Sequence, residues 1–218
     1  MKTIKIIPSL VVALALLASH AVMANNDDKF IEAIQKQIQT VYNAQSNEET
    51  QNAVNTLDRI GEAEKTKWEP YYYASFGYVM MANREKEAAK KDTYLDLALK
   101  GIEKAKALQP AESEIIALEG FVHMMRVTVD PASRGQQYSG MAFQSFNKAV
   151  AMNPENPRAL SLLAQMQYGT AQFFGSPTTE ACGTLSKALE KFDTFKSDNA
   201  LAPQWGRNMA EGLKSKCN

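Results

Sequence analysis

The sequence predicts an all-α fold in which helical hairpins stack into a solenoid of about nine helices with repeats of about 44 residues. The first observation is a recurrence, because one helical stretch that ends in proline returns later in altered form. The matching pairs are Tyr94 and Tyr138, Ala98 and Ala142, Ile102 and Phe146, Ala105 and Ala149, and Pro110 and Pro154. The second observation is that apolar residues recur at steps of three and four along the chain, which is the period of an α-helix.

Residues 1–24 are typical of a secretory signal peptide. Lys2 and Lys5 form a basic start, a short apolar run follows, and Val22-Met23-Ala24 places small residues where a signal peptidase reads them. We expect cleavage before Asn25 and a periplasmic or secreted protein. The alternatives are a membrane anchor or a core helix, although the apolar run is too short to span a bilayer. No later stretch is long and apolar enough to be a membrane span.

Residues 25–66 are predicted to form an N-terminal capping helical hairpin. Its first helix has an apolar face at helical spacing, and its second helix runs over residues 48–65. The residues of the first face are Phe30, Ile34, Ile38 and Val41. Because the end repeats of a solenoid must meet water on their outer side, an atypical first hairpin fits a cap.

Residues 67–201 are predicted to contain the repeats, in three pairs of helices. The first pair opens at Pro70, where the missing N–H of proline costs nothing, and Pro110 ends its second helix. A charged stretch over residues 83–92 connects the two helices. Both charge signs alternate there, so we interpret it as a solvated elbow; the alternative is a binding patch for a charged partner.

The second and third pairs follow the same plan. A loop is predicted over residues 131–140 of the second pair. In the third pair, Ser176-Pro177-Thr178-Thr179-Glu180 indicates a helix start, with a hydroxyl cap, a proline and an acid in the first turn. Residues 202–218 are predicted to form a C-terminal capping helix that opens at Pro203. Its inward face would carry Trp205, Met209 and Leu213.

Cys182 and Cys217 are the two cysteines of the chain. A cysteine pair in an exported protein favours a disulfide. If the last two helices are antiparallel, their turn over residues 197–200 lies midway between the two cysteines, so the sulfur atoms can meet. The alternative is a pair of free thiols in metal or redox work.

The charged residues balance, with 24 basic and 24 acidic side chains, which predicts no affinity for nucleic acid or an anionic membrane. After the signal peptide, His123 is the one remaining histidine, and we interpret it as a packing residue of a helix rather than an acid–base group or a metal ligand. No glycine-rich phosphate loop, nucleophile elbow or metal signature is present in the sequence. We therefore expect no metal, no cofactor and no enzymatic activity.

The repeat pattern resembles the tetratricopeptide repeat superfamily. The first matching repeat contains Tyr73, Phe76, Gly77, Met80, Ala98, Ile102, Ala105 and Pro110. The second contains Ile116, Glu119, Gly120, His123, Ala142, Phe146, Ala149 and Pro154, and the third contains Leu160, Leu163, Ala164, Gln167, Ala188 and Phe192, with Phe195 in place of the last alanine. The repeats are about ten residues longer than the usual 34, so longer helices or connections are expected. Residues 156–158 and 173–175 are also similar to exported repeat proteins of Gram-negative bacteria.

The resemblance implies a non-catalytic scaffold that binds a protein or peptide partner on the concave face formed by the first helix of each pair. The side chains that this implies for the groove are Tyr71, Tyr78, Met81, Phe121, Met124, Met125, Arg158, Gln165 and Tyr168. An alternative is that most of them are core residues. A second functional hypothesis is a carrier of a small hydrophobic ligand in the same groove, because aromatic and methionine side chains suit adaptable apolar binding.

Overall fold

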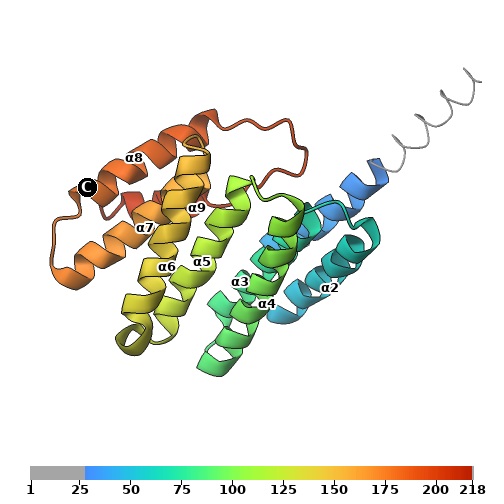
Figure 1. Cartoon of the computed structure of the whole chain (residues 1–218), viewed down its shortest axis with the longest axis horizontal. Helices are drawn as coiled ribbons and strands as arrows, with labels where there is room; N and C mark the ends of the chain where they lie inside the picture. Colours follow the sequence, from blue (N-terminus) through green and yellow to red (C-terminus); the bar gives the residue numbers. More distant parts are fainter. Residues whose placement is uncertain (1–27, 218) are drawn as a thin grey trace, which may run out of the picture.

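The computed structural model describes residues 28–217, and the predicted signal peptide lies outside them. Over this range the chain is helical and contains no strand, which confirms the predicted fold class (Figure 1). The first helix covers residues 28–43 of the described chain. The others are α2 (Asn47–Glu64), α3 (Glu69–Arg84), α4 (Ala88–Leu108), α5 (Ser113–Val129), α6 (Pro131–Met152), α7 (Pro157–Phe174), α8 (Thr179–Thr194) and α9 (Arg207–Lys214). None of these helices is long and apolar enough to cross a membrane.

The predicted period is confirmed by the starts of alternate helices. α3, α5 and α7 begin at Glu69, Ser113 and Pro157, so each start lies 44 residues after the previous one. α3 packs with α4, α5 with α6, and α7 with α8, and the hairpins stack side by side (Figure 1). We call the first helix, α3, α5 and α7 the A helices, because each is the first member of its pair.

The extra length of each repeat lies in its helices. α4 has 21 residues and α6 has 22, whereas residues 85–87 are the only break between α3 and α4. The predicted elbow over residues 83–92 is therefore mostly helical. Lys86, Glu87 and Lys90 are exposed, whereas Arg84 and Asp92 are partly buried and contact other helices.

Small residues allow helices to approach closely, both within a hairpin and between neighbouring hairpins. A Cβ atom added to Gly120 would lie 2.5 Å from the Phe146 ring, and one added to Gly77 would lie 2.5 Å from a Val54 methyl group. Ala142 and Ala149, on the same face of α6 as Phe146, are fully buried. The alternation of small and large residues in the repeat thus corresponds to close packing of α5 on α6.

Two elements differ from the sequence prediction. The predicted loop over residues 131–140 is the first half of α6, because Asp130 accepts hydrogen bonds from the Ser133 N–H and hydroxyl and Pro131 occupies the first turn. The last helix begins at Arg207 instead of Pro203, so Trp205 precedes it. Gly206 has a φ of 103°, a left-handed conformation that glycine adopts without strain, and it turns the chain into α9.

Candidate binding sites

The face of the A helices is covered by the chain itself. Residues 195–206, which we call the C-terminal strap, leave α8, run back toward α3 and then return to α9 (Figure 1). The Tyr73 hydroxyl donates to the carbonyl oxygen of Leu201 at 2.6 Å, and the backbone N–H of Gln204 donates to the Tyr42 hydroxyl at 3.2 Å. The strap is therefore fixed to the first helix and α3 by polar contacts between distant parts of the sequence.

Trp205 is the main apolar anchor of the strap. Its ring stacks on Phe76 of α3 and Phe121 of α5, with centroids 4.7 Å and 5.9 Å apart. Its indole N–H donates to the Tyr72 hydroxyl at 3.0 Å, so the polar atom of this buried side chain is also satisfied. Trp205 thus fills the space between two A helices.

A buried ion pair lies beneath the strap and joins α5 to α7. Arg158 binds Glu114 through two hydrogen bonds of 2.8 Å each, and both side chains are buried. Burial raises the pKa of the Glu114 carboxyl, and the guanidinium of Arg158 opposes that shift. The same guanidinium lies 4.5 Å from the centre of the Phe195 ring, at the start of the strap. The ion pair is therefore enclosed by protein and connects α5 to α7.

The structure places most of the nine predicted groove residues in the core. Tyr71, Tyr78, Met81, Phe121, Met125 and Arg158 are buried. Met124, Gln165 and Tyr168 are partly exposed, and Tyr168 packs against the small core between α7, α8 and α9. The physical reason is that each A helix lies between its neighbours and the strap. In this conformation only those three side chains offer surface to a partner, and binding at the predicted groove stays a prediction.

A pocket of about 360 Å³ lies between α6, α7 and the start of α8. We call it the α7 pocket. Phe143, Leu163, Phe174 and Pro177 supply its large apolar side chains. Its lining is completed by Asn147, Gln167, Thr170, Ala171, Ser176, Glu180 and Ala181. Sequence reasoning did not select this place, because its residues come from three helices.

Phe174, which lines the α7 pocket, and the adjacent Phe173, which does not, form an exposed aromatic pair. Phe173 is 78% exposed and Phe174 is 71% exposed, and their rings pack edge to face with centroids 5.0 Å apart. Met141 of α6 is the one other large hydrophobic side chain that is exposed within the described residues. No charged residue occurs in the sequence between Arg158 and Glu180. The first part of that uncharged stretch is buried in α7, and its Phe-Phe-Gly segment is exposed.

A second pocket, of about 400 Å³, lies between the first helix and the strap. Its lining includes Tyr42 and Tyr73, together with the exposed polar residues Gln35, Lys36 and Gln39. No exposed aromatic side chain borders it in the described chain. The lining of this second pocket is the more apolar of the two, and what distinguishes the α7 pocket is the exposed phenylalanine pair beside it.

His123 is buried on α5, as expected of a packing residue. Its ring stacks on Tyr138 with centroids 6.3 Å apart, and burial lowers its pKa. Its Nδ1 atom has no hydrogen-bond partner among the residues that the structure describes. Residues 28–217 contain no group of three or more His, Cys, Asp or Glu side chains that could hold a metal ion.

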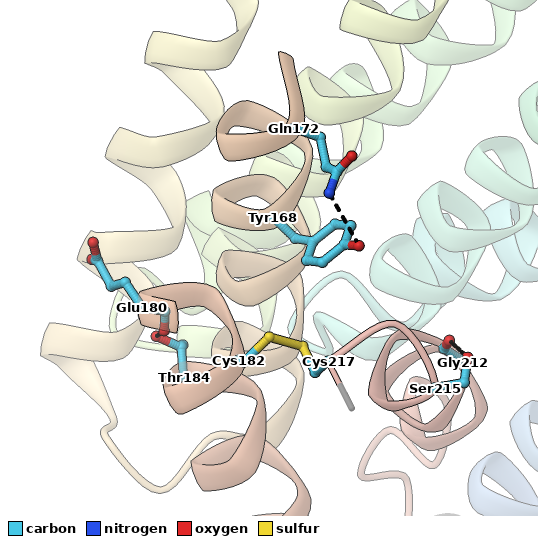
Figure 2. Close-up of a disulfide and its surroundings, with 8 residues drawn as sticks. All are labelled: Tyr168, Gln172, Glu180, Cys182, Thr184, Gly212, Ser215 and Cys217. Carbon is cyan, nitrogen blue, oxygen red and sulfur yellow. Dashed lines mark hydrogen bonds between the residues drawn. A yellow bond between two sulfur atoms is a disulfide. The ribbon is translucent and has the colours of Figure 1, made fainter. Parts of the chain in front are cut away.

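The predicted disulfide between Cys182 and Cys217 is present. It joins α8 to the end of the described chain, with Cα atoms 5.6 Å apart (Figure 2). In Figure 2, Glu180 points to the side of α8 away from the disulfide. The disulfide and the α7 pocket therefore lie on different sides of α8.

Among the solved structures that match this chain, two cover most of its length. The HusA haemophore from Porphyromonas gingivalis matches with a TM-score of 0.76 and 25% sequence identity, over 87% of this chain and 92% of that one. A tetratricopeptide repeat protein from Thermus thermophilus matches with a TM-score of 0.56 and 17% identity, over 88% and 94% of the two chains, which concerns the fold alone. The chain has a tetratricopeptide-like fold. No protein-family model and no curated protein sequence matches it.

Proposed function

We propose that this protein is an exported helical scaffold that carries a small hydrophobic ligand in the α7 pocket. The observation that carries the proposal is the exposed pair Phe173 and Phe174, of which Phe174 lines a pocket with both polar and apolar walls. The volume of the pocket, about 360 Å³, lies within the range of about 300–1,000 Å³ that is typical of ligand sites. The disulfide supports export, because such bonds persist in oxidising compartments. We assign no catalytic step to the protein.

The similarity to a haemophore makes a flat ring system the first ligand class to test. No His, Cys, Met or Tyr lines the α7 pocket in the described chain. The pocket would therefore hold such a ring through contact with Phe143 and Phe174, and it would supply no imidazole, sulfur or phenolate ligand to iron. Because the pocket supplies no ligand to iron, we expect a metal-free porphyrin to bind about as tightly as haem.

Absorbance and fluorescence titration of the purified mature protein with haem and with metal-free protoporphyrin tests this proposal. We expect binding of both, and a loss of affinity of about tenfold or more in Phe174→Ala, because one aromatic wall is removed. Gln35→Ala, at the second pocket, is the matched control and should leave the affinity unchanged. If neither ring binds, or if the control weakens binding as much as Phe174→Ala, the proposed site is wrong.

A protein or peptide partner is the second candidate function. The observation that favours it is Phe173, which is the more exposed of the two rings and does not line the pocket. Aromatic side chains of this kind dominate many interfaces. Phe173→Ala would then abolish retention of a partner from envelope extract and leave porphyrin affinity unchanged. Met124→Ala and Gln165→Ala test the A-helix face in the same way.

A further inference from the structure

The polar end of the α7 pocket is formed by Gln167 of α7 and Glu180 of α8. The Gln167 amide donates to a carboxylate oxygen of Glu180 at 2.9 Å. Because a carboxylate can only accept, this contact fixes the orientation of the amide, with the NH₂ group toward Glu180 and the carbonyl oxygen away from it. The two side chains therefore act as one polar unit in the pocket wall.

One end of this unit lacks a donor, and the other end is open to solvent. The carbonyl oxygen of Gln167 is buried and has no hydrogen-bond partner within residues 28–217. Glu180 is an exposed residue and accepts from Gln167 through one of its two oxygens. An unpaired buried acceptor costs free energy that a donor would recover, so the arrangement favours the arrival of hydrogen-bond donors.

The charge of the pocket lining also favours a ligand that donates hydrogen bonds. Glu180 is the only charged residue in the lining, and no Lys or Arg lines it. The aromatic rings of Phe143 and Phe174 also present negative faces, which attract cations. A carboxylate beside aromatic walls thus fits a positive group and repels a negative one.

We propose that the ligand of the α7 pocket carries an ammonium group next to its apolar body. The apolar body lies against Phe143 and Phe174, and the ammonium displaces the Gln167 amide and donates to Glu180. The amide gives up its hydrogen bond to Glu180 and can then turn its carbonyl oxygen toward the ammonium. The inference rests on the proposed function for the position of the site, and it adds the head group. A ring with carboxylate substituents would have to direct them away from Glu180.

The test compares two probes of one size and opposite charge, 3-phenylpropylamine and 3-phenylpropionate. Backbone amide shifts of the full mature protein report both the affinity and the place of binding, with Thr170 and Ser176 as local reporters. We expect the amine to bind at least about tenfold more tightly than the acid, as for a charge-assisted hydrogen bond. Equal affinities, or no binding of the amine, would overturn the inference.

Two variants test whether the carboxylate of Glu180 is the group that binds the amine. Glu180→Gln should weaken amine binding about tenfold and leave the acid unchanged or tighter. Glu190→Gln, on the same helix and not in the pocket lining, removes the same charge and should change neither affinity. If Glu190→Gln weakens amine binding as much as Glu180→Gln does, the effect is long-range and the assigned head-group site is wrong.

The porphyrin titration separates this inference from the proposed function. If porphyrins bind and the amine shows no preference, the pocket is a hydrophobic site and the head-group inference fails. If the amine binds at Glu180 and no porphyrin binds, the ring class fails and the head-group inference stands.

Discussion

Two aromatic clusters of this protein differ in what covers them. Phe76 and Phe121 on the A helices are buried under Trp205 of the strap. Phe173 and Phe174, at the end of α7, stand in solvent. The helical pattern places all four rings on apolar positions, but a later segment of chain closes one cluster and leaves the other open. The open cluster is where an external ligand has room.

Trp205→Ala should have the largest effect on stability, because it empties the space between Phe76 and Phe121 and leaves a buried cavity. We expect a loss of about 3–5 kcal/mol in the free energy of unfolding, measured by urea titration. Trp205→Phe is the control, since it retains a ring and loses the hydrogen bond to Tyr72. A loss below about 1 kcal/mol in the alanine variant would mean that the strap does not cover the A helices in solution.

Replacement of Cys182 and Cys217 by serine should cost about 3–4 kcal/mol, because the bond closes a loop with a sequence separation of 35. Hydrogen exchange should rise first in α9, which is the shortest helix and packs only on α7 and α8. The affinity of the α7 pocket should not change. Loss of ligand binding in the serine variant would show that the disulfide supports the pocket.

The pH dependence of stability should contain a contribution from His123. Burial lowers its pKa in the folded state, with Arg126 and Lys106 adding to the shift and Glu119 opposing it. The unfolded chain therefore binds the proton more tightly. This contribution is complete above the ordinary histidine pKa of 6.5 and is lost as the pH falls below it. Its slope cannot exceed about 1.4 kcal/mol per pH unit, the value for one proton.

His123→Gln tests that contribution, because glutamine has a similar shape and does not titrate in this range. Unfolding free energies at pH 7 and pH 5 should show a smaller decrease for the variant than for the natural chain. Equal decreases would mean that other groups carry the whole acid dependence.

Phe173→Ala should have the smallest effect on stability, within about 0.5 kcal/mol, because the ring is already exposed. Thermal unfolding of this variant, compared with Trp205→Ala, measures the difference between the two aromatic clusters directly. A loss of about 2 kcal/mol or more in Phe173→Ala would indicate that the ring is covered in solution, for instance by a second copy of the chain.

The repeat was predictable from the sequence because its contacts are local in the hairpins. Ala98, Ile102 and Ala105 recur with their period, and each is buried. The disulfide was predicted correctly from the cysteine pair, although the expected turn over residues 197–200 is part of the longer strap over residues 195–206. The strap could not be predicted in this way, because Trp205 meets Tyr72 across 133 residues of sequence and has no periodic partner.

The α7 pocket was missed for a related reason. Helical spacing identifies apolar positions, but it does not say which of them a later segment will cover. Phe174 and the buried Phe146 are equally hydrophobic, and only the packed structure separates them. Gln167 had been assigned to a repeat position of α7, and its pairing with Glu180 depends on how α8 docks.

The strap also changes how the array should unfold. A simple solenoid behaves as a row of units, each touching only its neighbours, so its ends can fray independently. Here the segment after α8 is hydrogen-bonded to the first helix and α3, so the two ends of the row share contacts. Unfolding of the C-terminal strap therefore exposes the first helix and α3. We expect the whole array to unfold in a single cooperative transition. During synthesis, the rings of Phe76 and Phe121 remain uncovered until nearly the whole chain has emerged, because Trp205 arrives last.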